Sequence, residues 1–178
     1  YCSLVVRIGD DRNLPAMLRA SEADTIVGYL RDDPQASARQ RVLRHTPWVL
    51  LRDAKSAVVE GNLETFCSRP HALVTPLGDL QGFVDDELEQ HGMKRRIVLG
   101  VTQFALLMPV LLGQDVLTTV PDFVARALIG MSGGSLAMED SPVAIPPVTN
   151  SAAWRGAVDR DPAERWFRSV VQEAFLNA

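Results

Sequence analysis

The amino-acid sequence predicts an α/β fold in which parallel-rich sheets are flanked by helices. Of the 178 residues, 47% are hydrophobic and 22% are charged, which is typical of an ordinary globular protein. Strand-like and helix-like segments alternate along the chain. The run Ile-Val-Leu-Gly-Val at residues 97–101 is apolar throughout, as strands buried on both faces of a parallel sheet are.

The expected strands are short apolar or β-branched runs, several of which end at glycine or proline. They cover residues 4–8, 24–28, 48–51, 71–75, 97–101, 116–120 and 148–155. Helices are expected over residues 14–18, 58–66, 83–90, 104–112, 121–129 and from 161 onward. In the last helix Trp166, Val170 and Ala174 lie four residues apart and predict its inner face. Residues 31–40 are expected to form a linker and residues 131–140 a loop. Repeated strand–helix–strand units of this length imply parallel pairing of the strands.

The charge and cysteine content exclude several classes of protein. The formal net charge is −4, so this segment alone is expected to bind nucleic acid poorly. The basic triplet Lys94-Arg95-Arg96 is interpreted as a solvated turn before a strand. No apolar run reaches the ~20 residues of a membrane span. Cys2 and Cys67 lack metal-ligand spacing, which argues against a disulfide scaffold or zinc site and fits a reducing cytoplasm.

No catalytic constellation is apparent, and we expect neither an enzyme, nor a cofactor, nor a metal site. Residues 130–134 have the Gly-x-Ser-x-Gly spacing of a nucleophile elbow, but we interpret their glycines as serving a flexible loop. The three histidines are far apart in the sequence, and no glycine-rich phosphate loop joins a strand to a helix. Asp85, Asp86, Glu87 and Glu89 are interpreted as a solvated acidic helix face rather than a catalytic dyad.

Two junctions between a strand and a helix are candidate ligand sites. In open parallel sheets, ligands bind outside the carboxyl ends of strands, where helix N-termini present unpaired N–H groups. One junction is Thr75-Pro76-Leu77-Gly78-Asp79, and the other is Val101-Thr102-Gln103-Phe104. Thr75, Asp79 and Gln103 fit ligand binding and simple helix capping equally well.

Four segments resemble LysR-type transcriptional regulators, in the order and spacing of that family. They are Leu-Arg-Ala-Ser-Glu-Ala-Asp-Thr-Ile-Val-Gly at residues 18–28, the strand and helix of residues 92–112, Asp-Val-Leu-Thr-Thr-Val-Pro at 115–121, and Asp-Pro-Ala-Glu-Arg-Trp-Phe-Arg at 161–168. The resemblance covers nearly the whole chain. It implies the effector-binding domain of such a regulator, with a two-lobed periplasmic-binding-protein-like (type II) fold. The proline in the helix of residues 104–112 and the tail suggest the branch that senses aromatic compounds and plant phenolics.

The resemblance also implies how the chain is organised. Lobe one would comprise residues 1–30 and 121–178, and lobe two residues 31–120. Lobe one would be incomplete at its N-terminus, because residues 4–8 align with the second strand of the family and the first would lie between them and residues 24–28. The DNA-binding helix-turn-helix is absent from this sequence, so we expect a part of a longer cytoplasmic protein. That protein would be a homodimer or homotetramer without membrane contact, reaching DNA only through the missing domain.

The resemblance places a small-molecule effector between the lobes. The expected effector-binding residues are Tyr29, Thr75, Gly78, Asp79, Gln81, Gln103, Phe104, Val120 and Pro121. Tyr29 and Phe104 offer flat apolar contacts while Thr75 and Gln103 offer hydrogen bonds, which suits an aromatic or phenolic molecule. Close relatives of the aromatic-sensing branch often carry histidine where Gln103 stands. The alternative function is a solute-binding protein of a transporter, which shares the architecture. An enzyme on a similar scaffold is a weaker alternative.

Overall fold

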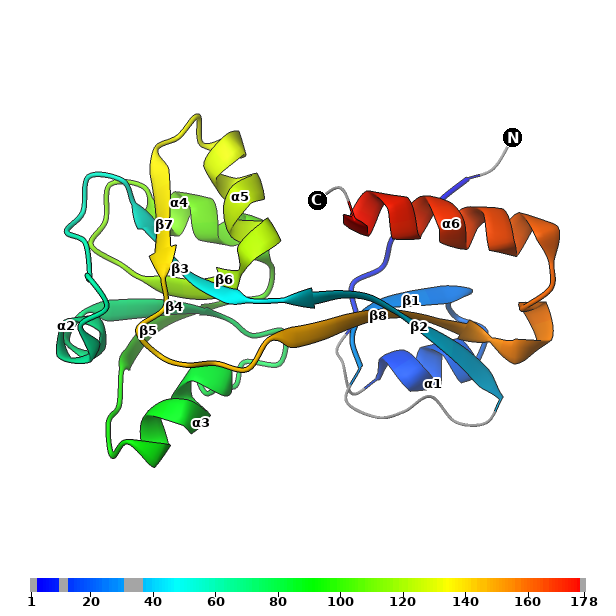
Figure 1. The fold of residues 1–178 in the computed structure, drawn as a ribbon, viewed down its shortest axis with the longest axis horizontal. Coiled ribbons are helices and arrows are strands. Elements are labelled where there is room, and N and C mark those ends of the chain that lie inside the picture. Colours follow the sequence, from blue (N-terminus) through cyan, green and yellow to red (C-terminus); the bar gives the residue numbers. More distant parts are fainter. Residues whose placement is uncertain (1–2, 10–12, 31–36, 177–178) are drawn as a thin grey trace. The chain divides into compact units, whose positions relative to one another are not determined.

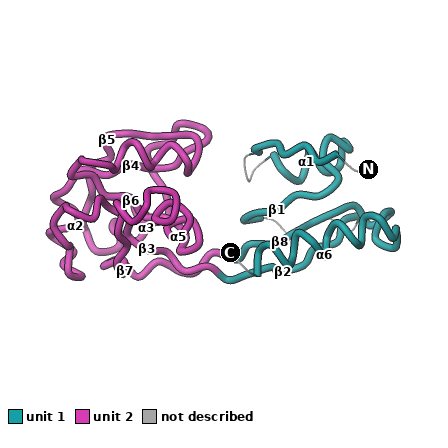
Figure 2. Tube along the Cα trace, turned by 90° about the horizontal axis from the view of Figure 1, so that it is seen from above, with its two compact units in different colours: residues 1–45, 149–178 teal, residues 46–148 magenta. Residues whose placement is uncertain are grey.

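The chain forms two compact units in a computed structural model that describes residues 3–9, 13–30 and 37–176. Unit 1 comprises Tyr1–His45 and Thr149–Ala178, and unit 2 comprises Thr46–Val148 (Figure 2). The expected lobes, residues 1–30 with 121–178 and residues 31–120, have other boundaries than these units. The division into those lobes stays a prediction. Residues 121–148 lie in unit 2.

Unit 1 is a three-stranded sheet with a helix on each face (Figure 1). The strands are in the order β1-β8-β2, and β1 runs antiparallel to β8. Its elements are α1 (Leu14–Arg19), β1 (Thr25–Tyr29), β2 (Ala38–Thr46), β8 (Val148–Arg155), the 3-10 helix η2 (Gly156–Val158) and α6 (Pro162–Leu176). Ile26 and Ala153 pack with Leu18 of α1, whereas Val27 and Ala152 belong to a separate cluster. Successive side chains of a strand point to opposite faces, so each helix covers its own apolar layer.

Unit 2 is an α/β/α arrangement around β3. Its elements are β3 (Trp48–Asp53), α2 (Leu63–Ser68), β4 (Pro70–Val74), α3 (Phe83–Gln90), β5 (Arg96–Val101), the 3-10 helix η1 (Phe104–Leu106), α4 (Leu107–Leu111), β6 (Thr118–Pro121), α5 (Asp122–Met131) and β7 (Leu136–Asp140). The sheet order is β6-β3-β7, and β4 pairs with β5. Leu50 and Leu51 of β3 are both fully buried. Leu50 packs with residues of α2 and α3, and Leu51 with residues of α4 and α5.

Parallel pairing is a smaller part of the molecule than the alternation of elements predicts. Within the described ranges it comprises the β4–β5 ladder and an isolated bridge between His71 and Leu117. Strand β3 is antiparallel to both β6 and β7. Residues 136–140, expected as a loop, form the strand β7. They pair with β3, and this pairing outweighs the loop preference of the glycines that precede them.

The predictions for residues 4–8 and for two other segments are wrong. Residues 3–9 form no regular element, and Val5 and Val6 are each 80% exposed. The helix expected from residue 58 begins only at Leu63, because Gly61 has a φ of +71° and the Asn62 side chain accepts a hydrogen bond of 2.8 Å from the Thr65 N–H as the N-cap. Of the expected linker, residues 31–36 lie outside the described residues, whereas residues 38–40 begin β2.

The inner face predicted for α6 is also wrong. Trp166 is 60% exposed and Val170 is 43% exposed, whereas Arg168 is only 9% exposed. The guanidinium carbon of Arg168 lies 4.5 Å from the ring centroid of Trp154 in β8. A cation above an aromatic face is stabilised by the ring's negative charge density. The helix therefore turns a charged residue toward the sheet where the apolar spacing predicts a tryptophan.

A groove of about 700 Å³ lies in unit 1 between residues 3–9, β1 and α6. Val27, Phe167 and Val171 contribute apolar side chains to it. In the described ranges β1 is paired on one edge only, with β8, and residues 3–9 do not join it. The groove lies where the resemblance places a further strand, and that placement stays a prediction.

No helix in the described ranges is long and apolar enough to cross a membrane.

Candidate functional site

The carboxyl ends of β4 and β5 bring the two predicted ligand-binding loops together. Val74 pairs with Val101 in the parallel ladder, and the Thr75 N–H donates a hydrogen bond of 2.7 Å to the Val101 carbonyl oxygen. Residues 75–82 and residues 102–104 therefore leave the sheet at the same edge. We call these two segments the β4–β5 edge. It contains Thr75, Gly78, Asp79, Gln81, Gln103 and Phe104.

Close packing fixes the base of the β4–β5 edge. Thr75 is buried, and a Cβ atom on Gly100 would lie 2.9 Å from its Cγ2 atom. The same Cβ would lie 3.2 Å from Cδ2 of Leu80. Only glycine leaves room for this approach. The chain then turns away at Gly78, whose φ is +85°, a conformation that favours glycine.

The first loop is tied to α3 by an ion pair that the sequence analysis missed. Nε and Nη2 of Arg95 donate hydrogen bonds of 2.8 Å to the two carboxylate oxygens of Asp85. The Gly82 N–H donates a third, of 2.9 Å, to the same carboxylate. Arg95 is only 9% exposed, so the interpretation of residues 94–96 as a solvated turn is wrong for it. A buried arginine ten residues after a first-turn aspartate leaves no periodic signal in the sequence.

The alternative that these side chains cap helices is not what the structure shows. The N-cap of α3 is Gly82, so neither Thr75 nor Asp79 occupies that position. Gln103 precedes η1, but its side chain makes no capping hydrogen bond. Gln103 is exposed and the neighbouring Phe104 is 37% exposed. An amide group and an aromatic ring are therefore accessible together at this edge.

The remaining predicted residues lie elsewhere. Val120 is fully buried among core residues of unit 2, and Pro121 is paired with Trp48. Tyr29 ends β1 in unit 1, where it is paired with Asn150. Gln81, by contrast, belongs to the β4–β5 edge, where it is exposed and its side-chain amide lies 3.5 Å from a carboxylate oxygen of Asp86 in α3. The assignment of Tyr29, Val120 and Pro121 to an effector site stays a prediction.

Strand β4 of unit 2 contains a buried histidine. His71 of β4 is fully buried, its Nε2 atom is 2.8 Å from the Phe66 carbonyl oxygen, and its Nδ1 atom has no hydrogen-bond partner. Burial lowers the pKa of His71 to about 4. Its ring meets that of Phe66 edge-on, with the two ring centroids 4.4 Å apart.

Among the described residues no three histidine, cysteine or acidic side chains lie close enough to hold a metal ion.

The chain matches the family model of the LysR substrate binding domain over residues 2–176. It is 29% identical over 168 residues to the HTH-type transcriptional activator NagR of Ralstonia sp, covering 93% of this chain and 55% of that protein. Nodulation protein D 3 of Rhizobium leguminosarum bv. phaseoli is 35% identical over 115 residues, which are 62% of this chain and 37% of that protein.

Solved structures agree with this match. The regulatory domain of MexT, a transcriptional activator in Pseudomonas aeruginosa, is 42% identical, with a TM-score of 0.76, over 90% of this chain and 76% of that domain. HinK, a LysR family transcriptional regulator from the same organism, is 14% identical, with a TM-score of 0.69, over 95% of this chain and 59% of that protein. At that identity the likeness concerns the fold alone.

The fold and the match over nearly the whole chain define a regulatory-domain module of the type II periplasmic-binding-protein-like class, as predicted. The chain belongs to the LysR substrate-binding domain family. It spans about half the length of the curated activators that it matches over most of its own length.

Proposed function

We propose that this chain is the effector-sensing module of a LysR-type transcriptional regulator and that it catalyses no reaction. Its relatives are named as transcriptional activators, which favours a regulator over the solute-binding protein of a transporter. In the intact protein an effector would favour one conformation of the module over another, and this bias would reach DNA-binding domains outside this sequence. The module itself carries a net charge of −4, which suits sensing better than direct DNA contact.

The observation that carries the effector site is the pairing of the two loops at the β4–β5 edge. The hydrogen bond from Thr75 to Val101 holds them at one end of a parallel pair, where ligands bind in sheets of this kind. Gln103 supplies an amide donor and acceptor, and Phe104 supplies an aromatic face. We propose a small aromatic or phenolic effector, because one polar partner beside one flat apolar surface matches that chemistry.

The test is titration calorimetry of the full chain against a panel of benzoates and phenols. Substituting Gln103→Ala should weaken the binding of any panel member by about 1–3 kcal/mol, since a polar group of the ligand loses its partner. Gln114→Ala is the matched control, because Gln114 is exposed in the same unit after α4. A binder whose affinity is unaffected by Gln103→Ala would refute the site. A panel without binders would refute the class of effector.

We also propose that the intact protein is a homodimer or homotetramer. Strand β5 is an edge strand, and its Val98 and Leu99 are 46% and 41% exposed. Leu106, in η1 after β5, is 46% exposed. Adjacent exposed apolar side chains of this size mark interaction surfaces. Sedimentation of the intact protein at tens of micromolar should show a dimer or larger species, and Leu106→Glu should shift it toward monomer. A monomeric parent protein would contradict the proposal.

A further inference from the structure

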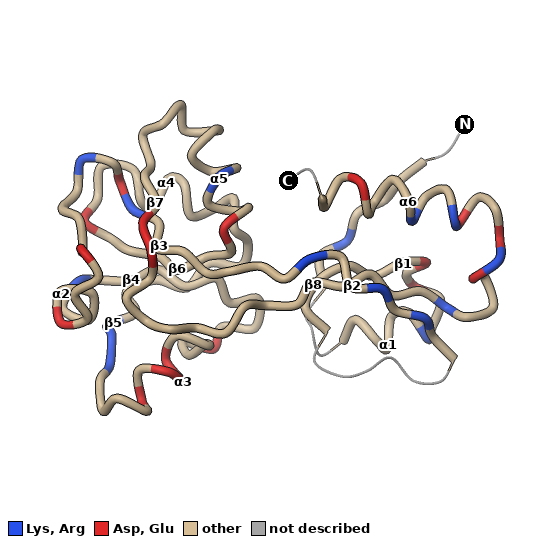
Figure 3. Tube along the Cα trace, viewed as in Figure 1, with Lys and Arg blue, Asp and Glu red and all other residues tan. Residues whose placement is uncertain are grey.

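Unit 1 contains a second cavity, of about 400 Å³, which the proposed effector site does not use. It lies over β2 and β8, beside the first half of α6. Four arginines and one aspartate contribute charge to its wall, and Leu43, Ala152 and Trp154 are the apolar residues among those that line it. The charged residues are Arg41, Asp159, Arg160, Arg165 and Arg168. Figure 3 shows basic residues along β2, and basic residues alternating with acidic ones in the turn before α6 and in the first part of that helix.

The arginines of this cavity are incompletely neutralised. Arg160 and Arg165 are exposed and make no side-chain hydrogen bond or ion pair with the described part of the chain. Arg41 donates a hydrogen bond of 2.7 Å to the neutral amide of Gln172. Asp159 is already engaged, because its carboxylate accepts a hydrogen bond of 2.9 Å from the Trp154 indole N–H.

Arg168 adds a buried positive charge to the cavity wall. Its Nη2 atom donates to the Asp159 carbonyl oxygen at 2.8 Å, and its Nη1 atom makes no hydrogen bond. The nearest carboxylate oxygen to Nη1 is Oε2 of Glu164, at 3.7 Å, which also has no hydrogen-bond partner. The pair is thus loosely made, although both atoms are shielded from water. A charge held in this way raises the positive potential above it.

We propose that this cavity binds a small molecule carrying a phosphate group. Guanidinium groups present planar forks of donors that match phosphate oxygens, and they do not lose their charge. Three exposed arginines arranged around a concave, partly apolar floor can surround such a group while its organic part covers Leu43 and Ala152. The chain as a whole is acidic, so its net charge does not attract anions. Any binding of a phosphate group would therefore depend on the arginines of this cavity. This site lies within unit 1 and is independent of the effector proposal.

The test uses inorganic phosphate as the probe and follows the indole N–H signals of the full chain by NMR at constant ionic strength. Phosphate should shift the Trp154 signal saturably, leaving that of Trp48 in unit 2 unchanged, and chloride should not reproduce the shift. The double substitution Arg160→Gln/Arg165→Gln should raise the dissociation constant for phosphate at least about ten-fold, because charge-assisted hydrogen bonds are lost. Neither side chain has a partner to lose, so folding should be retained.

The matched control is Lys94→Gln/Arg96→Gln, which removes the same charge from exposed positions of unit 2. It should change the dissociation constant by less than about two-fold, since charges that do not line the cavity contribute at most a screened attraction. An equal loss in the control would overturn the proposal, as would a shift that chloride reproduces or that does not saturate. Sulfate binding as tightly as phosphate would narrow the assignment to oxyanions in general and overturn the preference for phosphate.

Discussion

Both carboxylate oxygens of Asp85 accept hydrogen bonds of 2.8 Å from the guanidinium of Arg95, which joins the first turn of α3 to the start of β5. The Arg95 side chain is only 1% exposed. Removing one member of a buried pair leaves the other charge without compensation, which costs about 3–5 kcal/mol. Asp85→Ala should therefore lower the free energy of unfolding by an amount in this range, measured by urea denaturation.

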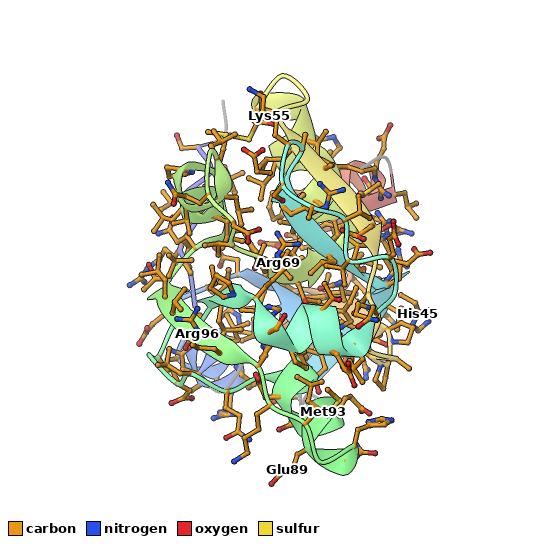
Figure 4. All side chains as sticks on the ribbon, turned by 90° about the vertical axis from the view of Figure 1, so that its left-hand side faces the viewer. His45, Lys55, Arg69, Glu89, Met93 and Arg96 are labelled. Carbon is orange, nitrogen blue, oxygen red and sulfur yellow. The ribbon has the colours of Figure 1, made fainter. Side chains whose placement is uncertain are left out.

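Glu89 provides the control for this substitution. It lies on the same helix and is exposed, at the periphery of the view in Figure 4, whereas the buried Arg69 lies nearer the centre. Glu89→Ala should change the free energy of unfolding by no more than about 0.5 kcal/mol. If Asp85→Ala costs no more than Glu89→Ala, the ion pair does not stabilise the β4–β5 edge.

The contact between Gly100 and Thr75 predicts a coupled pair of substitutions. Gly100→Ala would place a methyl group 2.9 Å from Cγ2 of Thr75, and crowding of this kind costs about 1–3 kcal/mol. Thr75→Ser removes that Cγ2 atom, so the double variant should be more stable than the sum of the two single effects predicts. Urea unfolding of all four proteins gives the coupling energy. Strict additivity would show that the clash is relieved elsewhere, at Leu80 or in the backbone.

His71 predicts a dependence of stability on pH. Its pKa is lowered from 6.5 to about 4 in the folded chain. Between these values the unfolded chain binds a proton that the folded chain does not, so stability is retained above pH 6.5 and falls as the pH drops toward 4. The expected loss on going from pH 7 to pH 5 is on the order of 2 kcal/mol.

Comparison of two variants isolates this contribution. His71→Gln keeps an amide donor near the Phe66 carbonyl but does not titrate, so the loss of stability between pH 7 and pH 5 should be smaller than in the parent chain. His91→Gln, at an exposed position, should leave the pH dependence of the parent unchanged. Equal pH dependence in the parent and in His71→Gln, measured by urea denaturation, would contradict the assignment.

Residues 3–9 and α1 should differ sharply in their contribution to stability. Val6 is 80% exposed and Leu18 is 2% exposed. Leu18→Ala should lower the free energy of unfolding by about 2–5 kcal/mol, because it opens a cavity beside Ile26 and Ala153. Val6→Ala should change it by at most about 0.5 kcal/mol. A large loss for Val6→Ala in thermal or urea unfolding would mean that residues 3–9 are covered in solution.

The local spacing of apolar residues predicted some helices and strands correctly. The helix of residues 83–90 is found at the predicted bounds, since Val84 and Leu88 are both buried against the same cluster. The strand of residues 97–101 is likewise confirmed, with one further residue at its start. For the helix, the apolar spacing and the burial agree. For the strand, the expected burial on both faces is wrong, because β5 pairs with β4 on one edge and its Val98 and Leu99 are 46% and 41% exposed.

The features that sequence analysis missed depend on residues distant in the chain. Strand β7 exists because Ala137 and Met138 pair with β3, and nothing in its own sequence reports that partner. In α6, Arg168 lies over Trp154, while the apolar residues Phe167 and Val171 line the groove beside β1. The loops of the β4–β5 edge could be predicted, because parallel strands present their carboxyl ends together. The fit of Gly100 against Thr75 could not, although a glycine inside an apolar strand is a recognised sign of close approach.

The division of the chain has a consequence for the order of folding during synthesis. Unit 2 is one continuous segment, Thr46–Val148, whereas unit 1 is assembled from two separated segments. The central strand of the unit 1 sheet is β8, which pairs with β1 through Ile26 and Ala153. A growing chain can thus complete unit 2 as soon as it leaves the ribosome. Strands β1 and β2 must wait for β8, with their apolar faces open until residues 148–155 emerge.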